Sequence, residues 1–234
     1  MDLLSAVGMA TKRRGDYFQQ AETLAKKVKD REDLENLMKK ESLVVVKGLR
    51  DKQIRWEEYE RTLLDKTLIS ALTAVYLGSE GKKPYDKMEK AWPVIVGDML
   101  TPLVAFLRET EARLEGGILK IGDQTLEFAD GISEEIATNE LQEKYGVGQT
   151  WPGVLARVVR YLANPAYSFF DLGRYYVREE QGYKEMRRVP RLDQRTCPDC
   201  IEFGAIGWRP LGTLPMPGRQ CQCYDHCRCS IEYR

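Results

Sequence analysis

Residues 51–78 read DKQIRWEEYERTLLDKTLISALTAVYLG, a segment in which apolar side chains return every three or four positions. The apolar positions that carry this pattern are Leu63, Leu64, Leu68, Ala71, Leu72 and Val75. The spacing gathers them on one face of a helix, so we predict a helix from about Asp51 to Leu77 that stops at Gly78. The segment therefore favours a mainly α fold.

Two further long helices are expected on either side of this segment. The stretch from Asp16 to Lys40 repeats the three-four spacing, with charged residues on the opposite face. Another helix should run from about Pro84 to Leu114, broken or kinked near Pro93 and Pro102, because proline interrupts the helical hydrogen bonds. Three long helices with short links predict an antiparallel helical bundle over residues 1–115.

Residues 116–186 are expected to form a short β-hairpin followed by helices. The run ILKIGDQTLEF, residues 118–128, alternates well enough for two short strands that turn at Gly122 and Asp123. The helices expected after it are Ser133–Tyr145, Pro152–Leu162 and Pro165–Glu180. The aromatic residues of the last helix, which at this spacing are typical of core or interface, are Tyr167, Phe169, Phe170, Tyr175 and Tyr176.

Composition and charge exclude several classes of protein. The chain has 234 residues, 43% of them apolar, and its 36 Lys and Arg equal its 36 Asp and Glu. That balance argues against a strongly basic nucleic-acid binder and a polybasic membrane-surface protein. The apolar stretch Ala91–Leu107 is interrupted by Pro93, Asp98 and Pro102 and falls short of ~20 residues, so we expect core and no membrane span. The first 15 residues lack the order of a secretory signal, which suggests a soluble intracellular protein.

The histidine content bears on catalysis. His226 is the one histidine, so a Ser-His-Asp hydrolase or a multi-histidine zinc enzyme would have to depend on it. It lies within a cysteine cluster, where it is a poor candidate for a free base. The sequence contains neither a GxxxxGK[ST] loop nor a GxGxxG fingerprint. We therefore expect the protein not to be an enzyme.

The last 48 residues differ sharply from the rest of the chain. Residues 187–234 hold eight Arg, no Lys and five acidic residues, a net charge of +3, whereas the remainder has a net charge of −3. All the cysteines fall in this tail, at Cys197, Cys200, Cys221, Cys223, Cys227 and Cys229. We interpret the tail as a separate Cys-rich module.

The cysteine spacing points to a metal before it points to disulfides, given the intracellular assignment. A C-x2-C turn places two thiolates on one ion, and Zn²⁺ takes four such ligands tetrahedrally. Cys227 and Cys229 form a C-x-C pair, and in a strand two side chains at this spacing lie on the same face. The intervening loop GAIGWRPLGTLPMPG, residues 204–218, is seven-fifteenths Gly and Pro, so it buries little and needs a staple, which a structural zinc supplies.

Six cysteines exceed the four that one zinc ion needs, so several arrangements stay open. Either two cysteines are spare, or a second ion, a disulfide or a redox role accounts for them. His226 is as well suited to a backbone or solvent-facing role as to ligation. A catalytic zinc would need an open coordination position and a nearby base, which a thiolate-rich site does not favour.

The tail as a whole resembles a known family. It carries DQRTCPDC over residues 193–200, GW at 207–208, PMPG at 215–218 and CRC at 227–229. These runs are similar to the C-terminal motif of the Mu F-like phage head-morphogenesis, or minor capsid, family. That family shows a D-x-R-T-C-x-x-C element, a Gly-containing spacer, a Pro-rich turn and a terminal C-R-C. The resemblance covers about Arg174 to Arg234.

The resemblance implies a structural protein of the virion or procapsid. It would act in head morphogenesis near the portal, with the portal or major capsid protein as partner and contact with packaged DNA as a further role. It would reside in the virion head, and in the host cytoplasm during assembly, with no membrane and no small-molecule substrate.

The resemblance also bears on the ligands. The family-matched candidates are Cys197, Cys200, Cys227 and Cys229. Many members place a histidine in a P-x-H-P-x-C-R-C run. Here Cys221, Cys223 and His226 replace that run, so the first two compete as ligands and the set stays open.

A second hypothesis comes from a different class of protein. Zinc ribbons often bind nucleic acid, and the Arg residues of the tail together with Trp208 are compatible with a nucleic-acid-binding adaptor or regulator. A local net charge of +3 is weak for that role. We therefore favour the structural head protein.

Overall fold

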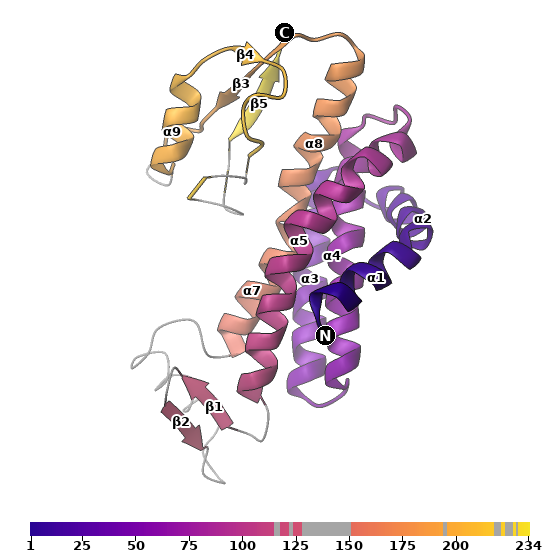
Figure 1. Cartoon of the computed structure of the whole chain (residues 1–234), viewed down its shortest axis with the longest axis vertical. Helices are drawn as coiled ribbons and strands as arrows, with labels where there is room; N and C mark the ends of the chain where they lie inside the picture. The colour runs from indigo at the N-terminus through magenta and orange to yellow at the C-terminus, as the bar shows by residue number, and fades with distance from the viewer. Residues whose placement is uncertain are drawn as a thin grey trace.

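A computed structural model describes residues 1–114, 118–121, 124–127, 151–193, 196–217, 221–222, 227 and 229–234. The fold is mainly helical with a small hairpin, as predicted, and it adds a C-terminal sheet that was not predicted (Figure 1). The helices are α1 (Leu3–Lys12), α2 (Arg14–Ala25), α3 (Arg31–Arg50), α4 (Trp56–Gly78), α5 (Pro84–Leu114), α7 (Trp151–Ala163), α8 (Pro165–Glu180) and α9 (Pro198–Ala205). The strands are β1 (Ile118–Ile121), β2 (Gln124–Glu127), β3 (Glu185–Val189), β4 (Arg209–Pro210) and β5 (Ser230–Tyr233).

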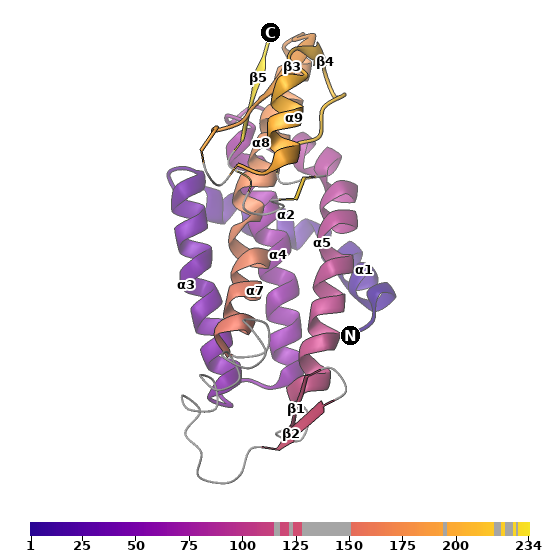
Figure 2. The same cartoon turned by 90° about the vertical axis from the view of Figure 1, so that its left-hand side faces the viewer.

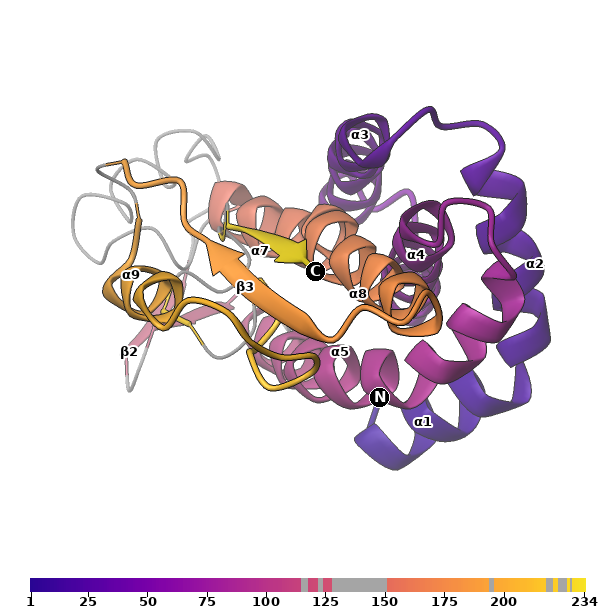
Figure 3. The same cartoon turned by 90° about the horizontal axis from the view of Figure 1, so that it is seen from above.

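The long helices run along the longest axis of the molecule. In Figures 1 and 2, α3, α4 and α5 lie beside α7 and α8, which follow one another end to end. The C-terminal sheet and α9 sit at one end of this bundle, and the β1–β2 hairpin sits at the other. Seen from above, β3 and β5 lie between α9 and α8 (Figure 3).

Helix α4 forms the centre of the bundle, because it is buried on nearly all sides. Its apolar residues, including the six that define the sequence pattern, lie in one core with residues of α1, α2, α3, α5, α7 and α8. Two of its buried hydroxyls are hydrogen-bonded within that core: the Ser70 hydroxyl donates to the Leu162 carbonyl at 2.6 Å, and the Thr73 hydroxyl to the Ile69 carbonyl at 2.7 Å. Such bonds lower the cost of burying the hydroxyls.

The N-terminal part contains more helices than the pattern predicts. The single helix expected over residues 16–40 is wrong, because α2 ends at Ala25 and α3 begins at Arg31. Asp30 starts α3 by accepting hydrogen bonds from the Glu32 and Asp33 amides, both at 2.9 Å. A side-chain cap of this kind fixes a helix start regardless of the apolar spacing around it. Helix α1 was not predicted.

Helix α5 runs through both Pro93 and Pro102 without a break. Its segment Pro84–Arg108 is long and apolar enough to cross a membrane by length and composition alone. In the fold, 44% of the most apolar stretch of this segment is buried, and side chains such as Ile95 and Leu103 belong to the bundle core.

The second half of the bundle is built as expected wherever the structure describes it. The β1–β2 hairpin pairs Ile118 with Glu127, α7 covers the helix expected from Pro152, and α8 matches its predicted range. The helix expected over Ser133–Tyr145 lies outside the described residues. In the aromatic stripe of α8, Phe169 and Tyr176 are buried in the core, as predicted.

Two glycines allow α4 and α8 to pack with their backbones in contact. A methyl group at Gly78 would overlap the carbonyl of Phe170, and one at Gly173 would overlap the carbonyl of Val75. Gly78 ends α4, as predicted. The absence of a side chain at Gly78 is what allows this close approach. Helix α8 is therefore held tightly against the centre of the bundle before the chain enters the C-terminal sheet.

The C-terminal sheet has the order β4-β3-β5, with both pairs antiparallel. Its register pairs Met186 with Tyr233 and Val189 with Ser230. One side of the sheet covers a small apolar cluster of Met186, Leu214, Met216 and Ile231. This cluster is separate from the bundle core. The α7 and α8 helices belong to the bundle core, and the described part of the Cys-rich tail forms around the sheet.

Candidate metal centre

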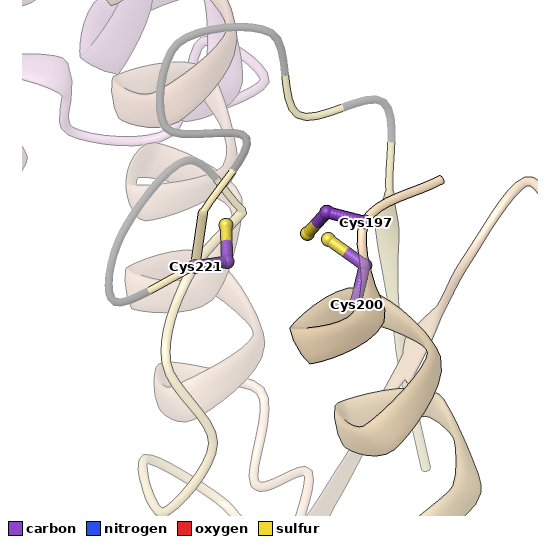
Figure 4. Close-up of side chains that lie close together, drawn as sticks. All are labelled: Cys197, Cys200 and Cys221. Carbon is purple, nitrogen blue, oxygen red and sulfur yellow. The ribbon is translucent and has the colours of Figure 1, made fainter. Parts of the chain in front are cut away.

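Five of the six candidate cysteines meet beside the C-terminal sheet. They come from three segments: Cys197 and Cys200 from the start of α9, Cys221 from the loop after Pro217, and Cys227 and Cys229 from the chain just before β5. The sulfurs fall into two groups, Cys197-Cys200-Cys221 and Cys200-Cys227-Cys229, and within each group they lie no more than 4.8 Å apart. Figure 4 shows the first group, in which the side chains of Cys197 and Cys200 face Cys221.

The C-x2-C element takes its shape from the start of α9. Cys197 precedes the helix in an extended conformation, and Pro198 occupies the first turn, where its missing N–H costs nothing. The Cys200 amide donates to the Cys197 carbonyl at 3.1 Å, which closes the turn. As a result the two thiols leave the same end of the helix and reach a common point.

Cys221 is positioned by a contact between its own loop and α9. The Gln222 amide donates to the Asp199 carboxylate at 2.7 Å. Because Asp199 lies between the two cysteines of the C-x2-C element, this bond holds the loop against the helix end. The third segment is held by β5, whose first residue, Ser230, follows Cys229 directly and pairs with Val189.

The distances suit a tetrahedral thiolate site. Four sulfurs about 2.3 Å from a zinc ion lie about 3.8 Å from one another. The Cys200 and Cys227 sulfurs are 3.7 Å apart. Soft thiolate ligands in this geometry select zinc or an iron–sulfur cluster over oxygen-preferring ions such as Mg²⁺ and Ca²⁺. The cysteine cluster can therefore hold a metal ion.

The cluster is also closed to solvent. Cys200, Cys221, Cys227 and Cys229 are each at most 7% exposed, whereas Cys197 is half-buried. These five cysteines are thiols that take no part in disulfides. A buried and fully sulfur-lined shell is typical of structural rather than catalytic metal sites.

A buried arginine, Arg188, completes the site. Its side chain is 1% exposed and comes from β3, whose alternation turns Met186 and Arg188 inward. One terminal nitrogen of its guanidinium lies 3.4 Å from the sulfur of Cys200, 3.2 Å from that of Cys221 and 2.9 Å from that of Cys227. This one side chain thus contacts cysteines from all three segments.

The ionisation of the cluster reflects these contacts. Burial alone would lower the pKa of Arg188, but the charge of Cys227 and hydrogen bonds to neighbouring sulfurs hold its pKa above the usual value, so the guanidinium stays charged. The pKa of the Cys229 thiol is raised, first by its hydrogen bond with Cys227 and then by burial. Crowded thiols therefore resist losing several protons together unless a cation joins them.

The sequence located the cluster but not all of its parts. Cys223 and His226 lie outside the described residues. Cys221, a competitor in the sequence analysis, lies in the same group as the C-x2-C pair. Arg188 was missed, although a charged residue at an inward position of an alternating strand is a signal that could have revealed it.

Comparison with known proteins adds no relative. No family model matches the chain, and neither a curated protein nor a solved structure matches it significantly.

Proposed function

We propose that the chain is a structural assembly protein whose C-terminal module is stapled by one zinc ion, and that it serves as a minor head protein of a tailed phage. The observation that carries the staple is the meeting of cysteine sulfurs from three segments of the tail beside one small sheet. The phage role is supported by the resemblance of residues 193–229 to the Mu F-like motif.

The proposed staple answers a need of this module. Its apolar cluster holds four buried side chains, Met186, Leu214, Met216 and Ile231. So small a core gives little stability on its own, and small modules commonly gain the remainder from metal binding. Cys200 belongs to both sulfur groups and is the central ligand; three of Cys197, Cys221, Cys227 and Cys229 complete the set.

A structural role is favoured over a catalytic one by the burial of the sulfurs. A catalytic zinc keeps one position open to water or substrate. Here the four most buried sulfurs leave little access, and the buried side chain beside them is a permanently charged arginine that cannot act as a base.

The alternative role in nucleic-acid binding has one supporting feature. The ring of Trp208 is flanked by Arg187 at 4.8 Å and Arg234 at 4.5 Å, an arrangement suited to stacking a base. Both arginines are already paired, with Glu232 and Glu185 respectively, at 2.6 Å. Because these carboxylates reduce the positive charge available to phosphates, the structural role remains our proposal.

The metal is tested by elemental analysis and thiol titration of protein purified under reducing conditions. We expect about one zinc per chain and two thiols that react in the native state, since the chain has six cysteines and a tetrahedral site uses four. Iron together with acid-labile sulfide would show that the cysteines hold an iron–sulfur cluster instead of zinc. A metal-free protein with all thiols reactive would contradict the staple.

The assembly role needs a separate test. Phage heads produced by the strain that encodes the chain are purified through a density gradient, treated with nuclease and analysed by mass spectrometry. A minor head protein is expected to sediment with the heads in a low, fixed ratio to the capsid protein. A chain found wholly in the soluble fraction, and shifted by DNA at low salt, would favour the nucleic-acid adaptor.

A further inference from the structure

Arg188 is an unusual residue to find inside a cysteine cluster. Its guanidinium is among the largest fully buried side chains in the described part of the protein. Removing such a cation from water is costly unless negative charge and hydrogen-bond acceptors surround it. After burial itself, the strongest influences on its pKa come from the sulfurs of Cys227, Cys221 and Cys229.

The orientation of the guanidinium is fixed by two further contacts. It lies 5.0 Å above the ring of Phe203, a residue of α9 that packs against the cysteines. Its second terminal nitrogen donates to the Pro215 carbonyl at 3.3 Å. These contacts leave the remaining terminal nitrogen directed at the sulfurs of Cys200, Cys221 and Cys227.

The chemistry of a metal–thiolate centre explains why a cation belongs here. A divalent ion bound by four thiolates leaves an excess of negative charge, which is unfavourable in a buried site. Hydrogen bonds from a charged donor are about twice as strong as neutral ones and would offset this excess. The guanidinium would also hold the sulfurs in a fixed orientation, as residues that hydrogen-bond to metal ligands commonly do.

We infer that Arg188 is the charge-compensating residue of the metal centre, donating N–H···S hydrogen bonds to its thiolate ligands and positioning them for the ion. The inference rests on the proposed metal centre. It makes β3 part of the site: the same strand places Met186 in the apolar cluster and Arg188 among the sulfurs. Loss of the guanidinium should therefore weaken metal binding without removing a ligand.

The test replaces Arg188 in the full chain and measures metal binding directly. Arg188→Met keeps much of the length of the side chain but removes its charge and its donors. Arg188→Lys keeps the charge but cannot span several sulfurs. The matched control is Arg187→Met, which changes the neighbouring residue of β3, whose side chain is 43% exposed and pairs with Glu232.

Affinity is measured by competition with a chromophoric chelator, and the bound site is observed by Co²⁺ substitution. We expect a 10- to 100-fold loss of affinity in Arg188→Met and a smaller loss in Arg188→Lys. The sulfur-to-cobalt charge-transfer band should move to longer wavelength in Arg188→Met, because the sulfurs lose their hydrogen bonds. A purely structural role for Arg188 would not shift that band. Arg187→Met should match the wild type in both measurements.

The wild-type chain tests the metal centre, and the Arg188 variants test the inference that rests on it. If the wild-type chain binds metal and both Arg188 variants bind it as tightly, with an unshifted band, the inference is wrong and the metal centre stands. If Arg188→Met does not fold, Arg188→Lys decides between the same two results. A wild-type chain that binds no metal overturns the metal centre and the inference together.

Discussion

Asp171 on α8 is a carboxylic acid placed where solvent does not reach. Asp171 is 1% exposed, and one of its carboxylate oxygens accepts a long hydrogen bond of 3.4 Å from the Arg174 guanidinium. Burial raises the pKa of Asp171 to about 6, and Arg174 and Arg31 offset only part of this effect. The folded protein therefore holds a proton that the unfolded chain releases near pH 4.

The sign of the pH dependence follows from that shift. Between about pH 4 and pH 6 the folded state binds more protons, so the free energy of unfolding falls as the pH rises, by about 3 kcal/mol in total. Asp171→Asn removes the ionising group. We expect the stability of the variant relative to the wild type to rise by about 2–3 kcal/mol from pH 4 to pH 7, measured by urea denaturation.

The control for this change is the exposed residue Asp16 on α2. Asp16→Asn makes the same chemical change at an exposed position and is measured over the same pH range. Comparing each variant with the wild type at the same pH and metal concentration cancels the pH dependence of the cysteine cluster. Parallel curves for Asp171→Asn and the wild type would contradict the raised pKa.

At the residue scale, the sequence predicts the cysteine cluster better than its surroundings. Cysteine spacing is a local signal, because Cys197 and Cys200 need only one helical turn to meet. The position of Arg188 is not local. It depends on β3 pairing with β5 and on the loop bringing Cys221 back to α9, contacts between residues far apart in the chain.

At the element scale, the apolar spacing predicts where helices exist but not where each one begins. The pattern from residue 16 to 40 continues through Asp30, yet α2 ends at Ala25 and Asp30 caps the start of α3. Capping depends on one side chain reaching two amides, and a count of apolar positions does not include it. Helix α5 also differs from its prediction, since proline was expected to break or kink it. It is continuous because its apolar face is buried in the bundle along both halves.

The contact between α4 and α8 gives a prediction at this scale. Gly173→Ala places a methyl group against the carbonyl of Val75 and 3.1 Å from the carbonyl carbon of Gly78. Backbone atoms cannot move aside as a flexible side chain can, so the helices must separate. We expect a loss of stability of about 3 kcal/mol, measured by chemical denaturation followed by circular dichroism.

The matched control is Gly8→Ala in α1. Apart from the adjacent residues and the backbone of α1 itself, no heavy atom lies within 4 Å of the methyl group that this change would add. Alanine should therefore stabilise the helix by about 0.5–1 kcal/mol. A Gly173→Ala variant as stable as the wild type would show that α4 and α8 do not pack at backbone contact.

At the scale of the whole molecule, the chain holds two cores of very different size. The bundle core gathers residues from seven of the described helices, whereas the sheet has a small cluster and the cysteines beside it. Tyr175 of α8 packs against both the bundle core and the cluster of the sheet. The abrupt change in composition near residue 187 predicted a separate module, and the helices of residues 116–186 were expected to lead into it, as α8 does.

This arrangement predicts that the two parts lose stability separately. Cys197→Ser with Cys200→Ser removes two thiols from one group of sulfurs, including the sulfur shared by both groups. Without the metal, the four buried side chains of the sheet cluster are too few to hold β3 and β5 together. Hydrogen exchange followed by mass spectrometry should show peptides from residues 185–189 and 230–234 exchanging at least tenfold faster.

Peptides from α4 should keep their protection in the same sample, because its core contacts involve none of the cysteines. Gly182, at a φ of +83°, sits in the turn between α8 and β3, where unfolding of the sheet can stop without entering the bundle. Equal loss of protection in α4 and β5 would mean that the chain folds as one cooperative unit. The metal would then stabilise the bundle as well as the tail, and its removal should lower the melting temperature of the whole protein in a single transition.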